Sequence, residues 1–194
     1  MWSKLKPMPY INMEPNYEEI HFKITDHDVR NASYWSLFAT PVAGITYGAN
    51  GVWPWLAEGE PILNHSHQAG VTGWRKSIEF PGSIQMGYLA GFFKQLEWWN
   101  LFPANDILVE QPGEKAFNQW VSVLKTPDHH IIVAYIPQKA DIELFNPGND
   151  EYTAQWFDPV SNSYQKAAIQ NHGGRIRIAQ NFDHDMLILL KRRR

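Results

Sequence analysis

The chain of 194 residues contains no cysteine. Disulfide bonds and zinc sites built on thiolates are therefore excluded. Charged residues make up only 19% of the sequence and the formal net charge is -3, which argues against a nucleic-acid partner. No segment approaches the roughly 20 apolar residues that span a bilayer, so we expect no membrane partner. The segment 1–7 lacks the long apolar stretch of a signal peptide.

Metal-binding and cofactor motifs are also scarce. His65 and His67 are the best chelating pair, but a metal site needs at least one more ligand nearby, and a polar loop explains this pair better. The sequence contains no P-loop, no GxSxG and no HExxH motif. We therefore expect neither a metal nor a cofactor.

Aromatic residues, in contrast, are abundant, with 9 Trp, 8 Tyr and 10 Phe. Trp and Tyr are costly to bury without polar partners, whereas their flat faces suit stacking on sugar rings. Two explanations stay open for any single Trp at this point, because a ring can equally fill a hydrophobic core.

The first half of the chain alternates strands and helices. Thr25 followed by Asp28 predicts a capping box that opens a helix. A long loop rich in Gly, Trp and Pro covers residues 50–82, and loops of this length are usually functional or disordered. The predicted elements are a strand at 8–13, a helix at 25–40, a strand at 43–49 and a helix at 81–96.

The second half, after Pro103, has the short, evenly spaced apolar segments of an all-β domain. Turn sequences such as Asn146–Asn149 and Asp158–Asn162 separate the segments. Strands at roughly ten-residue spacing predict a small antiparallel sandwich. The predicted strands are 116–124, 131–136, 142–145, 152–157, 164–169, 175–179 and 186–190.

Glu14 is the best candidate for a catalytic residue. It follows the first predicted strand and stands directly before Pro15, and barrel glycosidases keep a carboxylate nucleophile at such a strand end. The alternative is a loop Glu that binds backbone N–H groups. Glu18 and Glu19 follow too closely to be its partner, and we expect them in the loop or on a solvated face. Asp26, like Asp28, is explained as a charge at a helix start.

Four motifs, taken in order, resemble the apiosidase-like glycoside hydrolases, family 140 and its relatives. The resemblance covers nearly the whole chain. The enzymes of this group join a (β/α)8 barrel to a C-terminal β-sandwich that carries the name of collagen-binding domain. The motifs are Asn12–Glu18, Tyr34–Leu37 with Ala43–Trp53, Pro81–Met86 with Trp98–Trp99, and Trp156–Pro159.

The fold that this resemblance implies is α/β plus all-β. Residues 1–103 would form the C-terminal quarter of a (β/α)8 barrel, its last two βα units. Residues 104–194 would form the small antiparallel β-sandwich. A complete barrel needs roughly 200 to 250 residues, so most of a barrel is absent from this sequence.

The resemblance also implies the roles of individual residues. Glu14 would be the catalytic nucleophile at the end of the seventh barrel strand. Tyr17, Tyr47, Asn50 and Trp53 would bind the carbohydrate substrate, with Trp53 offering a ring face to a sugar. The acid/base carboxyl of such enzymes comes from an earlier strand, so this sequence offers no residue for it. Whether the chain is itself an enzyme is therefore left open.

Two functions are compatible with these observations. The first is a fragment of a retaining glycoside hydrolase that acts on side chains of plant or other polysaccharides. We expect this fragment to be inactive alone and to need a chain that supplies the rest of the barrel; the resemblance implies an exported enzyme. The second is a non-catalytic carbohydrate- or matrix-binding sandwich, in which aromatic residues either bind or form the core. Those residues are Trp120, Tyr152, Trp156 and Tyr164.

Overall fold

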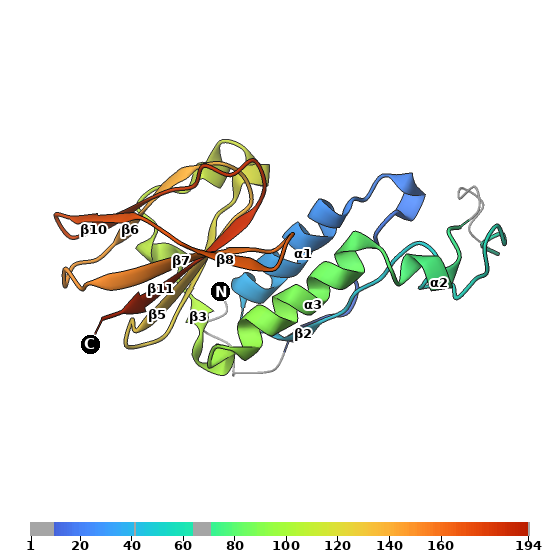
Figure 1. Ribbon diagram of the computed structural model, residues 1–194, viewed down its shortest axis with the longest axis horizontal. Helices are drawn as coiled ribbons and strands as arrows, with labels where there is room; N and C mark the ends of the chain where they lie inside the picture. Colours follow the sequence, from blue (N-terminus) through green and yellow to red (C-terminus); the bar gives the residue numbers. More distant parts are fainter. Residues whose placement is uncertain (1–9, 41, 64–70, 194) are drawn as a thin grey trace. The chain divides into compact units, whose positions relative to one another are not determined.

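The computed structural model describes residues 10–40, 42–63 and 71–193 (Figure 1). The backbone divides into two compact units. The first unit contains the described residues up to Leu37 and those from Val42 to Phe92. The second unit contains the described residues from Phe93 onward and the short segment that begins at Phe38. His65 and His67 lie outside the described residues.

A pair of parallel strands starts the first unit. Strand β1 (Tyr10–Asn12) pairs with β2 (Val42–Ile45), and Asn12 stands opposite Ile45. The two chain segments stay together beyond the strands, because the backbone N–H of Thr46 donates to the Asn12 carbonyl at 3.1 Å. The residues that follow the two strands therefore leave the same edge of this small sheet.

Helix α1 (Asp26–Ala39) begins with the predicted capping box. Both the backbone N–H and the hydroxyl of Thr25 donate to Oδ2 of Asp28, each at 2.8 Å. The backbone N–H of Asp28 donates in return to Oγ1 of Thr25 at 3.3 Å. This reciprocal bonding satisfies donors that the first helical turn leaves without a partner, and the prediction is confirmed.

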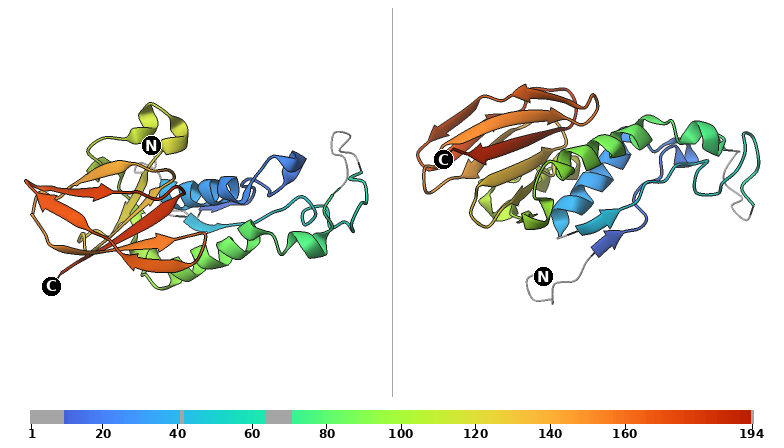
Figure 2. Two further views of the ribbon diagram at one scale, coloured as in Figure 1. Left: turned by 45° about the horizontal axis from the view of Figure 1, so that its top comes forward. Right: turned by 60° about the horizontal axis from the view of Figure 1, so that its bottom comes forward.

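A buried guanidinium joins α1 to helix α3 (Pro81–Lys94), and the two helices run side by side (Figures 1 and 2). Arg30 is only 3% exposed and donates to Asp26 Oδ2 at 2.6 Å and to Gln85 Oε1 at 2.7 Å. The Gln85 amide donates to Asp26 at 3.0 Å. Burial opposes the charge of Asp26, but the donors from Gln85 and Arg30 outweigh it and hold the pKa of this carboxyl below its ordinary value.

The long loop of the first unit contains a further helix that the sequence did not reveal. Helix α2 (Trp74–Ser77) has only four residues, too few for a hydrophobic period. Short 3-10 helices complete the helical structure of both units. These are Ile20–Phe22, Trp98–Asn100, Asn105–Ile107, Pro112–Glu114 and Phe117–Gln119. Within the described ranges, every helix is too short or too polar to cross a bilayer.

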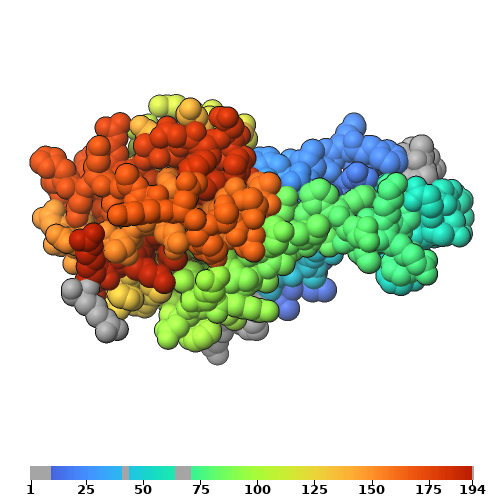
Figure 3. Space-filling model, in the orientation of Figure 1, coloured from blue at the N-terminus to red at the C-terminus, as the bar shows by residue number. Residues whose placement is uncertain are grey.

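Two antiparallel sheets form the second unit, which is drawn largely in yellow to red in Figure 3. One has six strands in the order β3-β4-β5-β11-β7-β8, and the other has three in the order β6-β10-β9. The strands are β3 (Phe102–Pro103), β4 (Ser122–Lys125), β5 (Ile131–Ile136), β6 (Asp141–Phe145), β7 (Tyr152–Asp158), β8 (Ser163–Lys166), β9 (Ile169–His172), β10 (Arg175–Ala179) and β11 (Met186–Arg192).

The hydrophobic core of the second unit lies between these sheets (Figure 2). Leu144, Ile176 and Ile178 come from the three-stranded sheet and are fully buried. Ile136 and Ile188 come from the six-stranded sheet and are buried in the same cluster. Side chains at alternate positions of each strand thus share one core, as the alternating sequence pattern of β6 and β10 predicts.

The opposite face of the six-stranded sheet is apolar as well. Tyr135, Phe157 and Leu187 have no exposed surface, although their strand neighbours point into the core described above. The ring of Phe38, which is counted within the second unit, lies 6.4 Å from the ring of Tyr135. Central strands buried on both faces read as continuous apolar runs, which is how 131–136 and 186–190 stand out in the sequence.

Two predicted strands are wrong in extent. The segment 116–124 is not a strand throughout, because Phe117–Gln119 is a 3-10 helix and β4 begins only at Ser122. The segment 164–169 is not a single strand, because β8 ends at Lys166 and β9 begins at Ile169 in the other sheet. The backbone N–H of Ala167 still donates to the Ala154 carbonyl at 3.0 Å before the chain leaves. Two small residues at the crossing point, Ala167 and Ala168, let the backbone pass from one sheet to the other.

The aromatic residues of the sandwich are mostly core residues. Tyr152 and Trp156 are 6% and 5% exposed and belong to the core cluster, so their rings pack in the core rather than standing on the surface. Tyr164 is 37% exposed, and its hydroxyl accepts a hydrogen bond from the Gln95 amide at 2.9 Å. Of the two roles that the sequence left open, the core role is therefore confirmed for Tyr152 and Trp156.

We expect Thr25→Ala to lower the free energy of unfolding by about 1 kcal/mol, because the helix start loses its reciprocal cap. Thr25→Ser keeps the hydroxyl and should stay close to the wild type. Urea denaturation followed by circular dichroism measures both variants. Equal losses in the two variants would show that the cap contributes nothing.

Candidate active site

Glu14 lies at the edge where β1 ends, and its side chain is exposed. The backbone N–H of Glu14 donates to the side-chain oxygen of Asn12 at 3.2 Å. The Asn12 amide donates in turn to Oγ of Ser36, on helix α1, at 2.7 Å. The strand end is thus fixed to the helix that follows, and the carboxylate of Glu14 is free to face a ligand.

Tyr17 holds the Glu14 carboxylate. Its hydroxyl donates to Oε1 of Glu14 at 3.2 Å. Its ring lies directly on the backbone of Gly48, where a β-carbon would overlap the ring. The same ring stacks on Trp53, with ring centres 6.5 Å apart and planes inclined by 15°. Glu14, Tyr17 and Trp53 therefore form one connected set. Burial first, and the neighbouring Glu14 charge and hydrogen bond next, raise the pKa of Tyr17.

Glu18 lies in the loop after β1, which is one of the two places that the sequence suggested. It does not lie on a solvated face, because its side chain is only 3% exposed. The Tyr47 hydroxyl donates to Oε2 of Glu18 at 2.7 Å, and the backbone N–H of Gly82 donates to Oε1 at 3.1 Å. Gly82 belongs to the first turn of α3, where backbone N–H groups favour an acceptor with negative charge. A β-carbon at Gly82 would overlap the Glu18 carboxylate.

Burial governs the ionisation of this pair. Burial raises the pKa of Glu18, and the hydrogen bonds from Tyr47 and Gly82 offset only part of that effect. Burial and the Glu18 acceptor also raise the pKa of Tyr47 far above its ordinary value. Tyr47 therefore keeps its proton and donates it in the hydrogen bond to Glu18, so its hydroxyl holds Glu18 in place.

Asn50 is buried beside the same segment, with 1% of its surface exposed. Its backbone N–H donates to the Glu18 carbonyl at 2.8 Å. Among the described residues, neither its side-chain oxygen nor its side-chain nitrogen has a hydrogen-bond partner. Buried polar groups without a partner are rare, and they concentrate where a ligand or water completes the bonding.

The other carboxylates of the first unit have structural partners, with Glu79 as the exception among the described residues. Glu19 accepts from Thr72, Asp26 pairs with Arg30, and Asp28 caps α1. Glu58 accepts from the backbone N–H of Gly73, and Glu60 from that of Ala57. Glu79 is exposed next to the end of α2. None of these partnered groups resembles an acid/base that faces Glu14.

A stack of rings in the long loop is a surface feature that the sequence did not reveal. The rings of Trp55 and Trp74 are nearly parallel, 4.3 Å apart, and the guanidinium of Arg75 lies 4.3 Å from the Trp74 ring centre. Trp55 is 64% exposed and has a positive φ of 54°. The only sequence signal was the density of Trp in this loop. An exposed, supported ring face is a surface on which a sugar can stack.

In the structure Tyr17 thus contacts both Glu14 and Trp53. Tyr47 and Asn50 both form hydrogen bonds with Glu18. Within the described residues, no group of three or more His, Asp or Glu side chains is arranged to hold a metal ion.

Comparison with known proteins identifies what this arrangement is similar to. Residues 1–100 match the family model described as "Apiosidase-like, catalytic domain". No curated protein sequence matches the chain. A solved structure described as "Glycoside hydrolase" superposes with a TM-score of 0.81 at 22% identity, over 96% of this chain and 43% of its own.

A second solved structure, a glycoside hydrolase family 5 protein from Bacteroides vulgatus ATCC 8482, gives a TM-score of 0.80 at 19% identity. The match covers 98% of this chain and 42% of that protein. At this level of identity the two structures show the fold alone. The chain spans less than half the length of either.

The raised pKa of Glu18 makes a prediction about pH. A carboxyl whose folded pKa is raised keeps its proton in the folded chain after the unfolded chain has lost it. The stability that protonated Glu18 contributes is therefore lost as pH rises from the ordinary pKa of a Glu carboxyl, about 4.3, through the higher pKa of Glu18 in the folded chain. Glu18→Gln cannot ionise, so we expect its stability relative to the wild type to improve between pH 4 and pH 7.5. Urea denaturation at both pH values measures this; an unchanged difference would contradict it.

The bond between Tyr17 and Glu14 is testable in the folded chain without any activity. We expect Glu14→Gln to lower the pKa of Tyr17, because the negative charge beside its hydroxyl is gone. The pKa should remain above the ordinary value, because burial persists. NMR titration of ring-labelled tyrosine measures it. Glu79→Gln removes the same charge from another exposed side chain and should leave Tyr17 unchanged.

Proposed function

The chain belongs to the apiosidase-like catalytic-domain family, and on that premise we propose that it is part of a retaining glycoside hydrolase. In this proposal residues 1–103 form the C-terminal quarter of a (β/α)8 barrel, which assigns to the barrel the segment 93–103 that the backbone groups with the second unit. The residues from 104 onward are an antiparallel β-sandwich. The parallel pair β1 and β2, with α1 between them and α3 after them, supports two consecutive βα units.

The observation that carries the proposal is the contrast between Glu14 and the other carboxylates of the first unit. Glu14 is exposed at the end of a parallel strand, and among the described residues the donor to its carboxylate is the hydroxyl of Tyr17. Active sites of (β/α)8 barrels lie at the C-terminal ends of the strands. A carboxylate in this place suits the nucleophile of a retaining glycosidase.

In this mechanism an oxygen of Glu14 attacks the anomeric carbon of the sugar. The bond from that carbon to the leaving oxygen breaks, and a second carboxyl, about 5 Å away, gives its proton to the leaving oxygen. Water then hydrolyses the glycosyl-enzyme bond with the second carboxyl as base. Tyr17 orients the Glu14 carboxylate through its hydroxyl.

The remaining site residues bind the carbohydrate. Trp53, supported by the ring of Tyr17, offers its face to a sugar ring. Asn50 offers an amide to a sugar hydroxyl. Tyr47 acts through Glu18, which fixes the segment that carries Asn50. The substrate class is a side chain of a plant or other polysaccharide.

The acid/base carboxyl comes from outside these 194 residues. The carboxylates near Glu14 in sequence bind other groups, and the solved glycoside hydrolases that superpose on this chain are more than twice as long. The chain is therefore inactive alone. A segment or a partner chain that supplies the first six βα units would complete the barrel.

We expect hydrolysis only when the chain is mixed with the first six βα units of a family member's barrel, and release of reducing sugar from polysaccharide measures it. Glu14→Gln should lower the rate of the mixture by about 10⁴-fold or more, as loss of a catalytic nucleophile does in other enzymes. Glu79→Gln is the matched control and should retain full activity.

Glu14→Ala offers a sharper test of the assigned role. Azide fits the space that the carboxylate vacates, and it can attack the anomeric carbon in its place. The expected product is a glycosyl azide, detected by mass spectrometry. A mixture in which Glu14→Ala hydrolyses polysaccharide at the wild-type rate would refute the assignment, and hydrolysis by the unmixed chain would refute its inactivity.

A further inference from the structure

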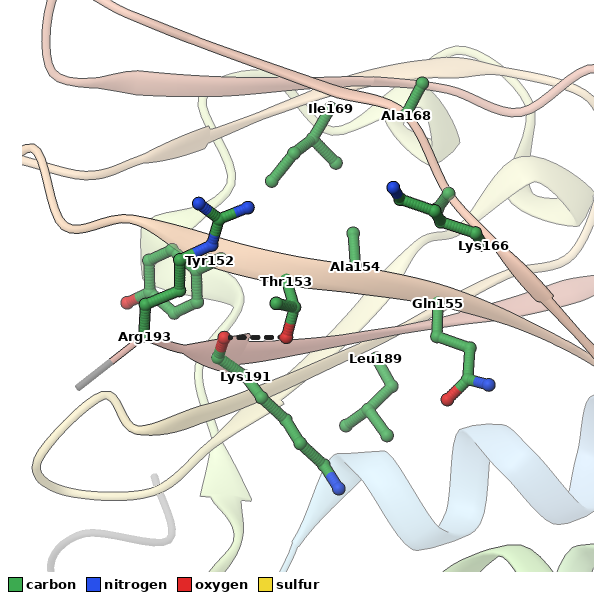
Figure 4. Close-up of a pocket in the computed structure, with 11 residues that line it drawn as sticks. Tyr152, Thr153, Ala154, Gln155, Lys166, Ala168, Ile169, Leu189, Lys191 and Arg193 are labelled. Atoms are coloured by element: carbon green, nitrogen blue, oxygen red, sulfur yellow. Dashed lines mark hydrogen bonds between the residues drawn. The ribbon is translucent and has the colours of Figure 1, made fainter.

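The second unit contains a groove along β7, on the side where its neighbour β8 ends (Figure 4). Its volume is about 550 Å³. Strand β8 pairs with β7 only from Gln155 to Asp158, and the chain then crosses to the other sheet as β9. The first residues of β7 are therefore left open on this side, and the crossing segment forms the opposite wall.

Cationic side chains dominate the polar lining of this groove. Lys166 comes from β8, Lys191 from β11, and Arg193 from the residue after β11 ends. Among the described residues, no acidic side chain lines the groove. Thr153 and Gln155, on the strand between the lysines, add neutral hydrogen-bonding groups. A chain with a net charge of -3 thus gathers three positive charges in one place.

Strand register fixes the positions of the two lysines. Lys191 stands opposite Thr153, and Lys166 stands opposite Gln155 on the other side of β7. Residues directly opposite share a face of the sheet, as do residues two apart on one strand. Both lysines therefore start from the same face of the sheet. Two strand spacings and one two-residue step separate their Cα atoms by roughly 12 Å.

The charges of the two lysines are not neutralised within the fold. Arg193 forms an exposed ion pair with Glu151 at 3.3 Å. Neither Lys166 nor Lys191 has a partner for its ammonium group among the residues that the structure describes. The backbone carbonyl of Lys191, in contrast, is bonded, since it accepts from the Thr153 hydroxyl at 3.2 Å. Like charges that share a groove repel each other, so folding gains nothing from them.

We propose that this groove binds an acidic polysaccharide, a chain whose sugar units carry carboxylate or sulfate groups. Figure 4 shows the side chains of Lys166, Lys191 and Arg193 leaving the strands in different directions. Separated cations match a polymer with repeated negative groups better than a single small anion. Thr153 and Gln155 lie between the lysines and are placed to bond sugar hydroxyls.

The preference for an anion rests on the groove alone, and the choice of a glycan rests on the proposed function. Binding here needs no catalysis and no Glu14, so it is measured on the full chain as it stands. Failure of this test therefore leaves the barrel assignment untouched.

The experiment is isothermal titration calorimetry of the full chain with four polymers. Alginate carries carboxylates, dextran sulfate carries sulfates, dextran is neutral, and poly-L-glutamate is an anion without sugars. We expect binding to at least one acidic glycan, weakened by salt. The pair Lys166→Gln and Lys191→Gln should lower that affinity by about tenfold or more, because two charge contacts are lost.

Lys139→Gln is the matched control, because Lys139 is exposed in the turn after β5 and does not line the groove. It should leave the affinity unchanged. Three results would overturn the proposal: no binding to either acidic glycan, equal binding to dextran or poly-L-glutamate, or equal affinity in the double variant. Lys166, which lies on the edge strand β8, would then serve only to keep that edge from pairing with other chains.

Discussion

The buried carboxylate of Glu18 joins three segments that are far apart in the sequence. One follows β1 and carries Glu14, one follows β2 and carries Tyr47, and one is the start of α3 at Gly82. Burying a carboxylate is costly unless donors compensate, and removing one donor leaves the other side unsatisfied. The loop that presents Glu14 therefore has one low-energy arrangement. The proposed role of Glu14 as a nucleophile requires such support, because a reacting group must be held within about 0.5 Å.

Glycine makes this close arrangement sterically possible. The Tyr17 ring rests on the backbone of Gly48, and the Glu18 carboxylate reaches the backbone of Gly82. Any larger residue at either position would push the segment away and break the contact chain from Trp53 through Tyr17 to Glu14. Two carboxylates four residues apart thus acquire opposite properties. Glu18 is desolvated and structural, whereas the carboxylate of Glu14 is exposed and accepts a hydrogen bond from the Tyr17 hydroxyl.

Local signals were readable in the sequence, and contacts across long separations were not. The capping box at Thr25 and the strands 131–136 and 175–179 depend on neighbouring residues or on simple periodicity, and the structure contains them as predicted. The burial of Glu18 depends on partners 29 and 64 residues away, for which the sequence has no sign. The same holds for the crossing after Lys166. The candidate site residues came from resemblance to a family. Their contacts in the structure then distinguish them, because Tyr17 contacts Glu14 whereas Tyr47 contacts Glu18.

The buried amide of Asn50 lowers the stability of the fold. Its amide is buried and, among the described residues, has no hydrogen-bond partner, a deficit of about 1–3 kcal/mol for such a group. An alanine or leucine would be the more stable choice for a position that served folding alone. The backbone N–H of Asn50 already holds the Glu18 carbonyl, and any residue except proline could do that. No hydrogen bond of the side chain to a described residue explains its choice at this position, and the proposed function supplies a partner in a sugar hydroxyl.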